Sequence, residues 1–255
     1  MAVAPVRIDE LSKSRWPVFG AAIAGVLIAG GPAASEPKAV LELFTSQGCS
    51  SCPPADKLIG EYADRDDVLA LSFNVDYWDY LGWKDTLANP DNTERQRAYA
   101  SARGDRQVYT PQVVVNGREH VIGSKKAEIE SAMARGSGLP VKIGLTEKDD
   151  AITVSLAKED SVAHNATLWL VFYRSEVTVP IERGENTGKT VTYSNVVKKL
   201  RPIAMWKGDA LSVDLPKSEM AKAKTKRCAV LLQTETETGL PGPILGAAMF
   251  DYDRE

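Results

Sequence analysis

The residues best suited to chemistry are two cysteines, Cys49 and Cys52, in the stretch LELFTSQGCSSCPPADKLIG, residues 41–60. Two residues separate them, and the chain of 255 residues has only one other cysteine. A thiolate is the reactive form of cysteine, and a helix N-terminus favours it because free backbone N–H groups and the helix dipole stabilise negative charge. The spacing therefore indicates a redox pair in which Cys49 is the nucleophile and Cys52 is the resolving thiol.

Three other interpretations of the cysteine pair are open. A structural zinc site usually takes four ligands, and Cys228, His120 and His164 show no ligand spacing that would complete one. A structural disulfide would close a loop too short to constrain the unfolded chain much. A copper-chaperone site would depend on His120 alone. We therefore expect no metal or organic cofactor, and the redox group is the disulfide between Cys49 and Cys52.

Composition indicates a globular chain, with 44% hydrophobic and 25% charged residues, long enough for one large domain or two smaller ones. The formal net charge is -3, and acidic and basic residues are scattered along the chain. Binding of nucleic acid needs a basic stripe, which this pattern does not supply. We therefore expect no nucleic acid partner.

The N-terminal segment, residues 1–35, has the pattern of a secretory signal. Two basic residues precede an uncharged apolar run over residues 18–30, and the small residues Ala33, Ala34 and Ser35 follow it. The run is shorter than the roughly 20 apolar residues that span a bilayer. We expect cleavage after this run, with a retained anchor as the alternative, and no later segment could span a membrane. Export into an oxidising compartment favours pairing of the cysteines.

The first part of the mature chain, residues 36–138, predicts the order strand, helix, strand, inserted helix, strand, strand, helix. AVLELF and VLALSFNV are apolar runs typical of buried parallel strands, and they bracket a helix that begins after Cys52. Residues 76–107 break this rhythm and predict an inserted aromatic loop and helix. Asn116 and Gly117 then predict a hairpin turn.

Beyond a linker near residue 138, alternating segments over residues 139–255 predict an antiparallel β-sandwich. The stretch RGENTGKT resembles a phosphate loop, but three residues separate Gly184 from Gly188 where that motif needs four. We expect it to be a loop between strands. Cys228 lies in RCAVLLQ, a predicted core strand, where a free cysteine behaves as a small buried hydrophobe, and a third redox thiol is its other interpretation.

The context of the cysteine pair resembles the thioredoxin fold, because CSSC lies between a strand and a helix and TP precedes a later strand. The resemblance implies that Cys49 attacks, that Cys52 resolves, that Pro111 is cis beside the sulfurs, and that the Thr110 backbone pairs with a bound polypeptide. Thioredoxins also keep a buried carboxylate on the strand before the motif. Glu42 is the nearest candidate, one residue out of register, and a strand-end or partner-bound carboxylate is its other interpretation.

Four longer stretches resemble an uncharacterised family of secreted bacterial proteins: LELFTSQGCSSCPPAD, NVDYWDYLGWKD, RGENTGKTVTYSNVV and GPILGAA. The resemblance covers nearly the whole mature chain. It implies an α/β thioredoxin-like domain followed by an all-β sandwich domain, in a bacterial protein that is periplasmic or secreted.

The aromatic stretch DYWDYLGWKD follows the second predicted strand, and ligands of open α/β sheets gather at the carboxyl ends of strands. Asp76, Tyr77, Trp78 and Trp83 are therefore candidates for substrate binding, with a packed cover over the sheet as the alternative. The sequence predicts an exported thiol-disulfide oxidoreductase whose partner is a protein or a small thiol or disulfide. The alternative function is a non-catalytic periplasmic binding or interaction module.

Overall fold

The structure is a computed structural model that describes residues 36–136, 138–161 and 165–251. The predicted signal, residues 1–35, and His164 lie outside the described residues. All of the described residues belong to one compact unit. Within them, no helix has both the length and the apolar character needed to cross a membrane.

The first half of the described chain follows the predicted order of elements. These are β1 (Ala39–Thr45), α1 (Pro53–Ala63), β2 (Val68–Asn74), the 3-10 turn η1 (Asp79–Leu81), α2 (Pro90–Arg103), β3 (Gln112–Val115), β4 (Glu119–Ile122) and α3 (Lys126–Arg135). The two apolar runs form β1 and β2, which are buried along their whole length. The insertion supplies η1 and α2, and α2 begins behind Asn89, whose side chain accepts a hydrogen bond from Asp91 N.

The hairpin predicted at Asn116 and Gly117 connects β3 to β4. Both residues have positive φ angles, 49° and 65°, which asparagine and glycine adopt more readily than other residues. A Cβ at Gly117 would lie 2.6 Å from the carbonyl oxygen of Gly242. The turn therefore requires glycine at this position for its backbone angle and for its close packing.

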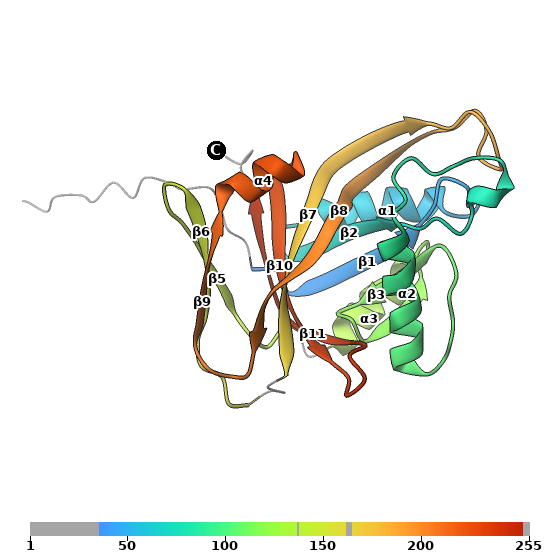
Figure 1. Ribbon diagram of the computed structural model, residues 1–255. Helices are drawn as coiled ribbons and strands as arrows, with labels where there is room; N and C mark the ends of the chain where they lie inside the picture. Colours follow the sequence, from blue (N-terminus) through green and yellow to red (C-terminus); the bar gives the residue numbers. More distant parts are fainter. Residues whose placement is uncertain (1–35, 137, 162–164, 252–255) are drawn as a thin grey trace, which may run out of the picture. The chain divides into compact units, whose positions relative to one another are not determined.

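The second half of the described chain consists mainly of strands. They are β5 (Ile143–Glu147), β6 (Ala151–Leu156), β7 (Ala166–Pro180), β8 (Thr190–Trp206), β9 (Leu211–Pro216), β10 (Arg227–Glu235) and β11 (Pro241–Asp251), with the short helix α4 (Lys217–Ala223) after β9. Strands β7 and β8 pair antiparallel over most of their length and form a long hairpin, which extends to the upper right of Figure 1. We call its end, residues 181–189, the hairpin tip.

Strands from both halves form one eight-stranded mixed sheet in the order β11-β10-β7-β8-β2-β1-β3-β4 (Figure 1). The junction is between β2 and β8, which pair in parallel at Ser72 and Val196. Beside it, Ser72 Oγ donates to the Ser194 carbonyl at 2.7 Å, and Asn195 Nδ2 donates to the Ala70 carbonyl at 2.8 Å. The second half of the chain therefore extends the sheet of the first half.

The predicted fold class, a thioredoxin-like α/β domain followed by a separate all-β sandwich, is wrong. The described chain is mostly β, and the eight-stranded sheet is accompanied by a three-stranded sheet in the order β5-β6-β9. The physical reason is a core that both halves must build together: Phe44 and Phe73 pack in one buried cluster with Val171, Tyr173 and Leu231. The boundary predicted near residue 138 falls in the connection between α3 and β5.

Helices cover both faces of the sheet at its β1–β3 end. One cluster joins α1 and α3 to β1, β2 and β3, and it includes Leu41, Leu43, Ile59 and Ile129. On the opposite face, Tyr99 of α2 packs edge-on against Phe44. The three-stranded sheet packs on β7, β10 and β11 through a third cluster. The cysteine motif thus lies where β1 ends and α1 begins.

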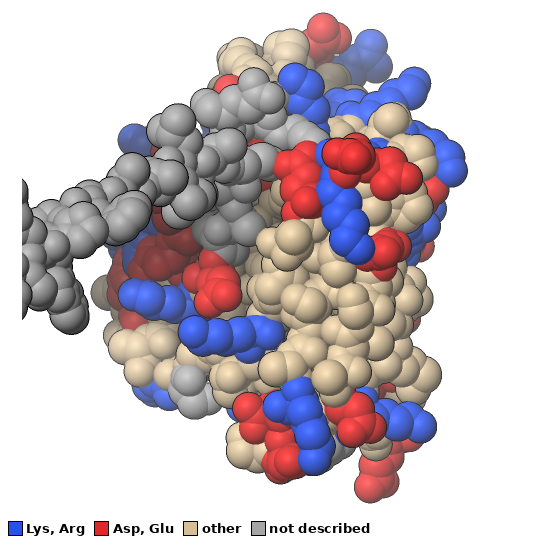
Figure 2. All heavy atoms as spheres, turned by 90° about the vertical axis from the view of Figure 1, so that its left-hand side faces the viewer, with Lys and Arg blue, Asp and Glu red and all other residues tan. Residues whose placement is uncertain are grey.

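Figure 2 shows the side of the molecule on which β5, β6 and β9 lie. Lys and Arg side chains there alternate with Asp and Glu around a broad area without charge. The visible part of this face therefore carries mixed charge rather than a basic stripe.

Candidate functional site

Cys49 and Cys52 form a disulfide, with Cα atoms 5.4 Å apart. Cys52 occupies the N-cap position of α1, so the pair lies at the start of a helix, as the sequence predicts. The Oγ atom of Ser51 lies 3.5 Å from Cys49 Sγ. Both cysteines are buried, with exposed fractions of 1% for Cys49 and 0% for Cys52. A partner can therefore reach Cys49 only when the residues that surround it move.

The first turn of α1 offers fewer free N–H groups than an ordinary helix start. Pro53 and Pro54 have no N–H, and the N–H groups of Ala55 and Asp56 donate to the Cys52 carbonyl at 2.8 and 3.0 Å. The dipole of this 11-residue helix and the Ser51 hydroxyl remain to stabilise a thiolate at position 49.

Thr110 and Pro111 lie beside the first turn of α1, and the peptide bond between them is cis, as the resemblance implies. A Cβ added to Gly123 would lie 3.1 Å from Pro111 Cβ and 3.2 Å from Ala55 Cβ, which places the proline against the helix start. In the described part of the chain, neither the N–H nor the C=O of Thr110 has a hydrogen-bond partner. Its hydroxyl accepts from Trp78 Nε1 at 2.8 Å.

The aromatic insertion covers the turn that leads into the cysteine motif. A Cβ at Gly48 would lie 3.0 Å from Trp78 Cβ, so the tryptophan leaves no space for a side chain there. Trp83 Nε1 donates to Gln47 Oε1 at 2.8 Å. Trp78 and Trp83 are both half-buried. Of the four predicted binding residues, these two contact the residues just before Cys49 and help to bury that turn.

The other two predicted binding residues, Asp76 and Tyr77, contact α2. Asp76 Oδ1 accepts from Thr93 Oγ1 at 2.6 Å, and Tyr77 Oη donates to Gln96 Oε1 at 3.2 Å. Burial raises the pKa of Tyr77 to about 12, so the phenol is a hydrogen-bond donor at neutral pH. These contacts tie the insertion to the helix that follows it.

Glu42 lies on the face of the sheet opposite α1. Alternation along β1 directs Leu41 and Leu43 toward α1 and places Glu42 on the α2 side. Its carboxylate is fully buried, pairs with Arg95 Nε at 2.8 Å, and accepts a hydrogen bond from Tyr99 Oη. The interpretation as a partner-bound carboxylate fits this position, whereas a role beside the resolving thiol does not.

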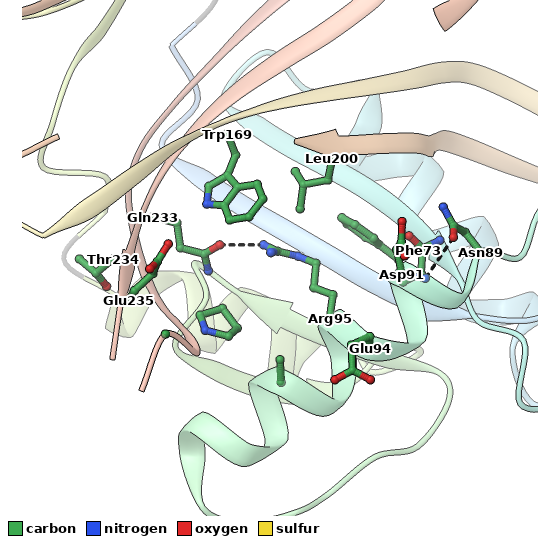
Figure 3. Close-up of a pocket in the computed structure, with 14 residues that line it drawn as sticks. Phe73, Asn89, Asp91, Glu94, Arg95, Trp169, Leu200, Gln233, Thr234 and Glu235 are labelled. Atoms are coloured by element: carbon green, nitrogen blue, oxygen red, sulfur yellow. Dashed lines mark hydrogen bonds between the residues drawn. The ribbon is translucent and has the colours of Figure 1, made fainter. Parts of the chain in front are cut away.

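The Glu42–Arg95 pair adjoins a cavity of ≈ 290 Å³ between α2 and the sheet (Figure 3). Its lining includes the apolar side chains of Phe73, Trp169 and Leu200. Arg95 also donates to Gln233 Oε1 at 2.9 Å, the contact drawn in Figure 3. Trp169 Nε1 is buried and has no hydrogen-bond partner among the described residues. The cavity can therefore hold a small molecule with an apolar body.

Sequence reasoning missed Asp56, which is 2% exposed. Its Oδ1 accepts from Thr45 Oγ1 at 2.6 Å, and its Oδ2 has no partner in the described part of the chain. Burial raises its pKa to about 8, the negative charge of Asp85 adds to this shift, and the Thr45 bond opposes it. Asp56 N donates to the Cys52 carbonyl across one helical turn, so both side chains lie on one face of α1.

The signal for Asp56 was a carboxylate inside the apolar stripe of a predicted helix, next to Ala55 and close to Ile59. A second cavity, of ≈ 340 Å³, runs between α1 and β8 and reaches Asp56. Its lining includes Lys57, Gly60 and Thr192. This opening reaches the residue, whereas its Oδ2 atom is itself buried.

No group of three or more metal-ligating side chains occurs in the described ranges. His120 Nδ1 is 2.8 Å from Tyr109 Oη, and its Nε2 is 3.2 Å from Asp105 Oδ2. Cys228 is confirmed as a buried residue of a core strand, β10, with 3% exposure. Burial raises the pKa of its thiol to about 12, which keeps it protonated and unreactive.

The sequence from residue 40 to residue 233 matches the family described as "Protein of unknown function (DUF1223)". The chain belongs to this family. None of the curated proteins matches it.

Two solved structures are similar to the protein. Protein AGR_C_4864 from Agrobacterium tumefaciens, known from an X-ray crystal structure, is 39% identical at a TM-score of 0.75, over 84% of this chain and 94% of that chain. HBP35 of Porphyromonas gingivalis is 14% identical at a TM-score of 0.59, over 86% of this chain and 76% of that chain. The second likeness concerns the fold alone.

Proposed function

We propose that this protein is an exported thiol-disulfide oxidoreductase that acts through Cys49 and Cys52. The observation that carries the proposal is the disulfide at the start of α1, next to the Thr110–Pro111 segment and one helical turn from a buried, half-unpaired carboxyl. A structural disulfide needs none of these neighbours. An exported location is consistent with a stable disulfide between the two cysteines.

The reaction is a pair of thiol-disulfide exchanges. When the protein acts as a reductant, the Cys49 thiolate attacks one sulfur of a partner disulfide, forms a mixed disulfide and releases the other partner sulfur as a thiolate. Cys52 then attacks Cys49 Sγ, the Cys49–Cys52 bond forms, and the second partner sulfur leaves. Two electrons pass to the partner, whose two sulfurs end as thiols. The opposite direction runs through the same steps in reverse order.

Asp56 holds the proton that Cys52 exchanges in this reaction. With a pKa of about 8 beside the closed disulfide, its carboxyl is mostly protonated at pH 7. When a partner thiolate opens the disulfide at Cys49, Cys52 leaves as a thiolate and Asp56 supplies its proton. When the protein acts as a reductant, the same carboxylate takes the proton from the Cys52 thiol. The cavity between α1 and β8 borders Asp56, so a small local movement would admit water to its carboxyl.

The partner is a protein or a small molecule that carries a thiol or a disulfide. The unpaired backbone of Thr110 gives an extended polypeptide one N–H and one C=O with which to pair. Trp78 and Trp83 border the same site and supply apolar surface. These features favour a protein partner.

Reduction of insulin by dithiothreitol, catalysed by the protein, tests this proposal. The wild-type chain is expected to accelerate precipitation of the insulin B chain, and Cys49→Ser is expected to abolish the acceleration, while Cys228→Ser keeps it because that thiol is buried and inert. Equal activity in the wild type and Cys49→Ser would reject the proposal.

The alternative proposal is a non-catalytic binding module, and the cavity beside Arg95 is the observation that favours it. Its apolar walls, formed by Phe73, Trp169 and Leu200, suit a small ligand with an apolar body. On this alternative, the Cys49→Ser/Cys52→Ser variant would bind its ligand as tightly as the wild type. A quenching titration of tryptophan fluorescence with a library of small aromatic acids distinguishes the two functions.

A further inference from the structure

The hairpin tip, residues 181–189, contacts the cysteine motif through one buried side chain. Asn186 is 1% exposed, and its Nδ2 donates both hydrogens to the motif: to the Gln47 carbonyl at 2.9 Å and to the Cys49 carbonyl at 2.8 Å. Asn186 and Cys49 are 137 positions apart in the sequence. The second half of the chain therefore supplies a side chain to the disulfide site.

The orientation of the Asn186 amide follows from the chemistry of its partners. Lys189 Nζ donates to Asn186 Oδ1 at 2.8 Å. An ammonium group can only donate and a carbonyl oxygen can only accept, so Nδ2 must face Gln47 and Cys49. The side chain is thus held from both ends.

The backbone of the hairpin tip is closed by its own hydrogen bonds. Gly188 N donates to the Ile181 carbonyl at 2.8 Å, and Ile181 N donates to the Lys189 carbonyl at 2.9 Å. Gly184 has a φ of +79°, and a Cβ there would lie 3.1 Å from Trp83 Cβ. The tip therefore presents Asn186 as a preformed unit that packs against the aromatic insertion.

The insertion also holds the segment from Gln47 to Cys49. Gln47 N donates to Asp85 Oδ2 at 2.8 Å, and the Gln47 side chain accepts from Trp83. Asn186 is the contact through which the hairpin tip holds the same segment. With the hairpin tip and the aromatic insertion in these positions, Cys49 is 1% exposed.

We propose that Asn186 is a positioning residue of the disulfide site and that the hairpin tip controls access to Cys49. Its two hydrogen bonds fix the Cys49 backbone while the tip is closed, and their release opens a path to the sulfur. The role in the catalytic cycle rests on the proposed oxidoreductase function. Control of access to the disulfide is a property of the chain that can be measured without a partner.

The test is the rate at which dithiothreitol reduces the disulfide in the full chain. Dithiothreitol gives two electrons, becomes a cyclic disulfide, and leaves Cys49 and Cys52 as thiols. Asn186→Ala is expected to react about 10-fold faster than the wild type, since it loses two hydrogen bonds that hold the tip closed. Lys189 is exposed, and Lys189→Met leaves the two hydrogen bonds from Asn186 Nδ2 in place. This variant is expected to react about 3-fold faster than the wild type.

Thr187→Ala is the matched control, because Thr187 is exposed and its Oγ1 bonds only to Gly184 within the tip. It is expected to react at the wild-type rate within about 2-fold. Alkylation of the buried Cys228 reports global unfolding in the same samples. A rate for Asn186→Ala within about 2-fold of the wild type, or an equal acceleration of Cys228 alkylation, would overturn the proposal. Failure of the insulin assay alone would remove the proposed function and leave this result standing.

Discussion

At the scale of residues, the proposed thiol-disulfide exchange depends on two buried groups one helical turn apart, the Cys52 sulfur and the Asp56 carboxyl. Hydrogen bonding satisfies only one oxygen of Asp56, and burial favours its neutral form. A neutral acid one helical turn from a sulfur that alternates between thiol and disulfide is a candidate for proton transfer. This pairing makes Asp56 the residue whose loss should separate the two exchange steps.

Asp56→Asn is expected to slow resolution of a mixed disulfide on Cys49 by roughly 10-fold or more, because Cys52 loses the group that takes its proton. The first attack by Cys49 should change little. Quenched-flow mass spectrometry with glutathione disulfide measures both steps. Equal lifetimes of the mixed disulfide in wild type and variant would contradict this role.

The same carboxyl should make stability depend on pH. Its pKa rises from an ordinary 3.8 to about 8 on folding, so the native state keeps a proton that the unfolded state has lost. Between these values, the free energy of unfolding should fall as pH rises, by up to about 1.4 kcal/mol per pH unit. Asp56→Asn should flatten the curve.

Urea unfolding at a series of pH values measures this slope. Asp64→Asn, at the exposed end of the same helix, should keep the wild-type slope and serves as the control. The slope is the informative quantity, because the amide NH₂ introduced by Asp56→Asn would lack a partner and would offset the whole curve by an amount that does not depend on pH. An unchanged slope in Asp56→Asn would mean that the pKa of Asp56 is not raised in the folded protein.

At the scale of elements, the pair of Glu42 and Arg95 joins β1 to α2, and Arg95 continues the contact to β10 through Gln233. The side chains of Arg95 and Glu42 are 9% and 0% exposed. Removing one partner of a buried pair leaves a charge without compensation. The network therefore fastens α2 to the sheet on the face opposite the disulfide.

Arg95→Ala is expected to lower the free energy of unfolding by about 3 to 5 kcal/mol. The double variant Glu42→Leu/Arg95→Met should recover most of this loss, since it removes both charges and keeps the volume. Denaturant titration at pH 7 compares the three chains. A small loss in Arg95→Ala, below about 1 kcal/mol, would mean that the pair is as weak as one on the surface.

Disulfide chemistry should be insensitive to the same network. Because Glu42 points away from α1, Glu42→Gln is expected to resolve mixed disulfides at the wild-type rate within about 2-fold, in contrast to Asp56→Asn. The mixed-disulfide assay measures both variants side by side. Slow resolution in Glu42→Gln would restore it as the proton acceptor.

At the scale of the whole molecule, the sheet joins both halves of the chain through the pairing of β2 with β8. Phe44 and Phe73 of the first half share a buried cluster with Val171, Tyr173 and Leu231 of the second. We expect one cooperative unfolding transition, with coincident circular dichroism and tryptophan fluorescence curves. A fragment of residues 36–138 should expose this cluster and fail to fold. Two separated transitions would contradict a shared core.

The elements of the first half could be predicted from local patterns, since apolar runs mark β1 and β2 and Asn116–Gly117 marks the hairpin. The pairing of Ser72 in β2 with Val196 in β8 could not be predicted from the sequence. The pattern of apolar residues along a strand indicates which of its faces is buried, but it does not indicate which strand lies beside it. The cysteine motif was found by spacing. Asn186 was missed because its contacts with the motif exist only after the halves have packed.

Whether Cys49 is an attacking sulfur is measured by the pH dependence of its alkylation by iodoacetamide in the reduced protein, followed by mass mapping. The helix dipole and the Ser51 hydroxyl favour the thiolate, so we predict an apparent pKa below about 7.5, with Cys228 protected throughout. An apparent pKa near about 8.5 or higher for Cys49 is the value of an ordinary thiol and would contradict its role as the attacking sulfur.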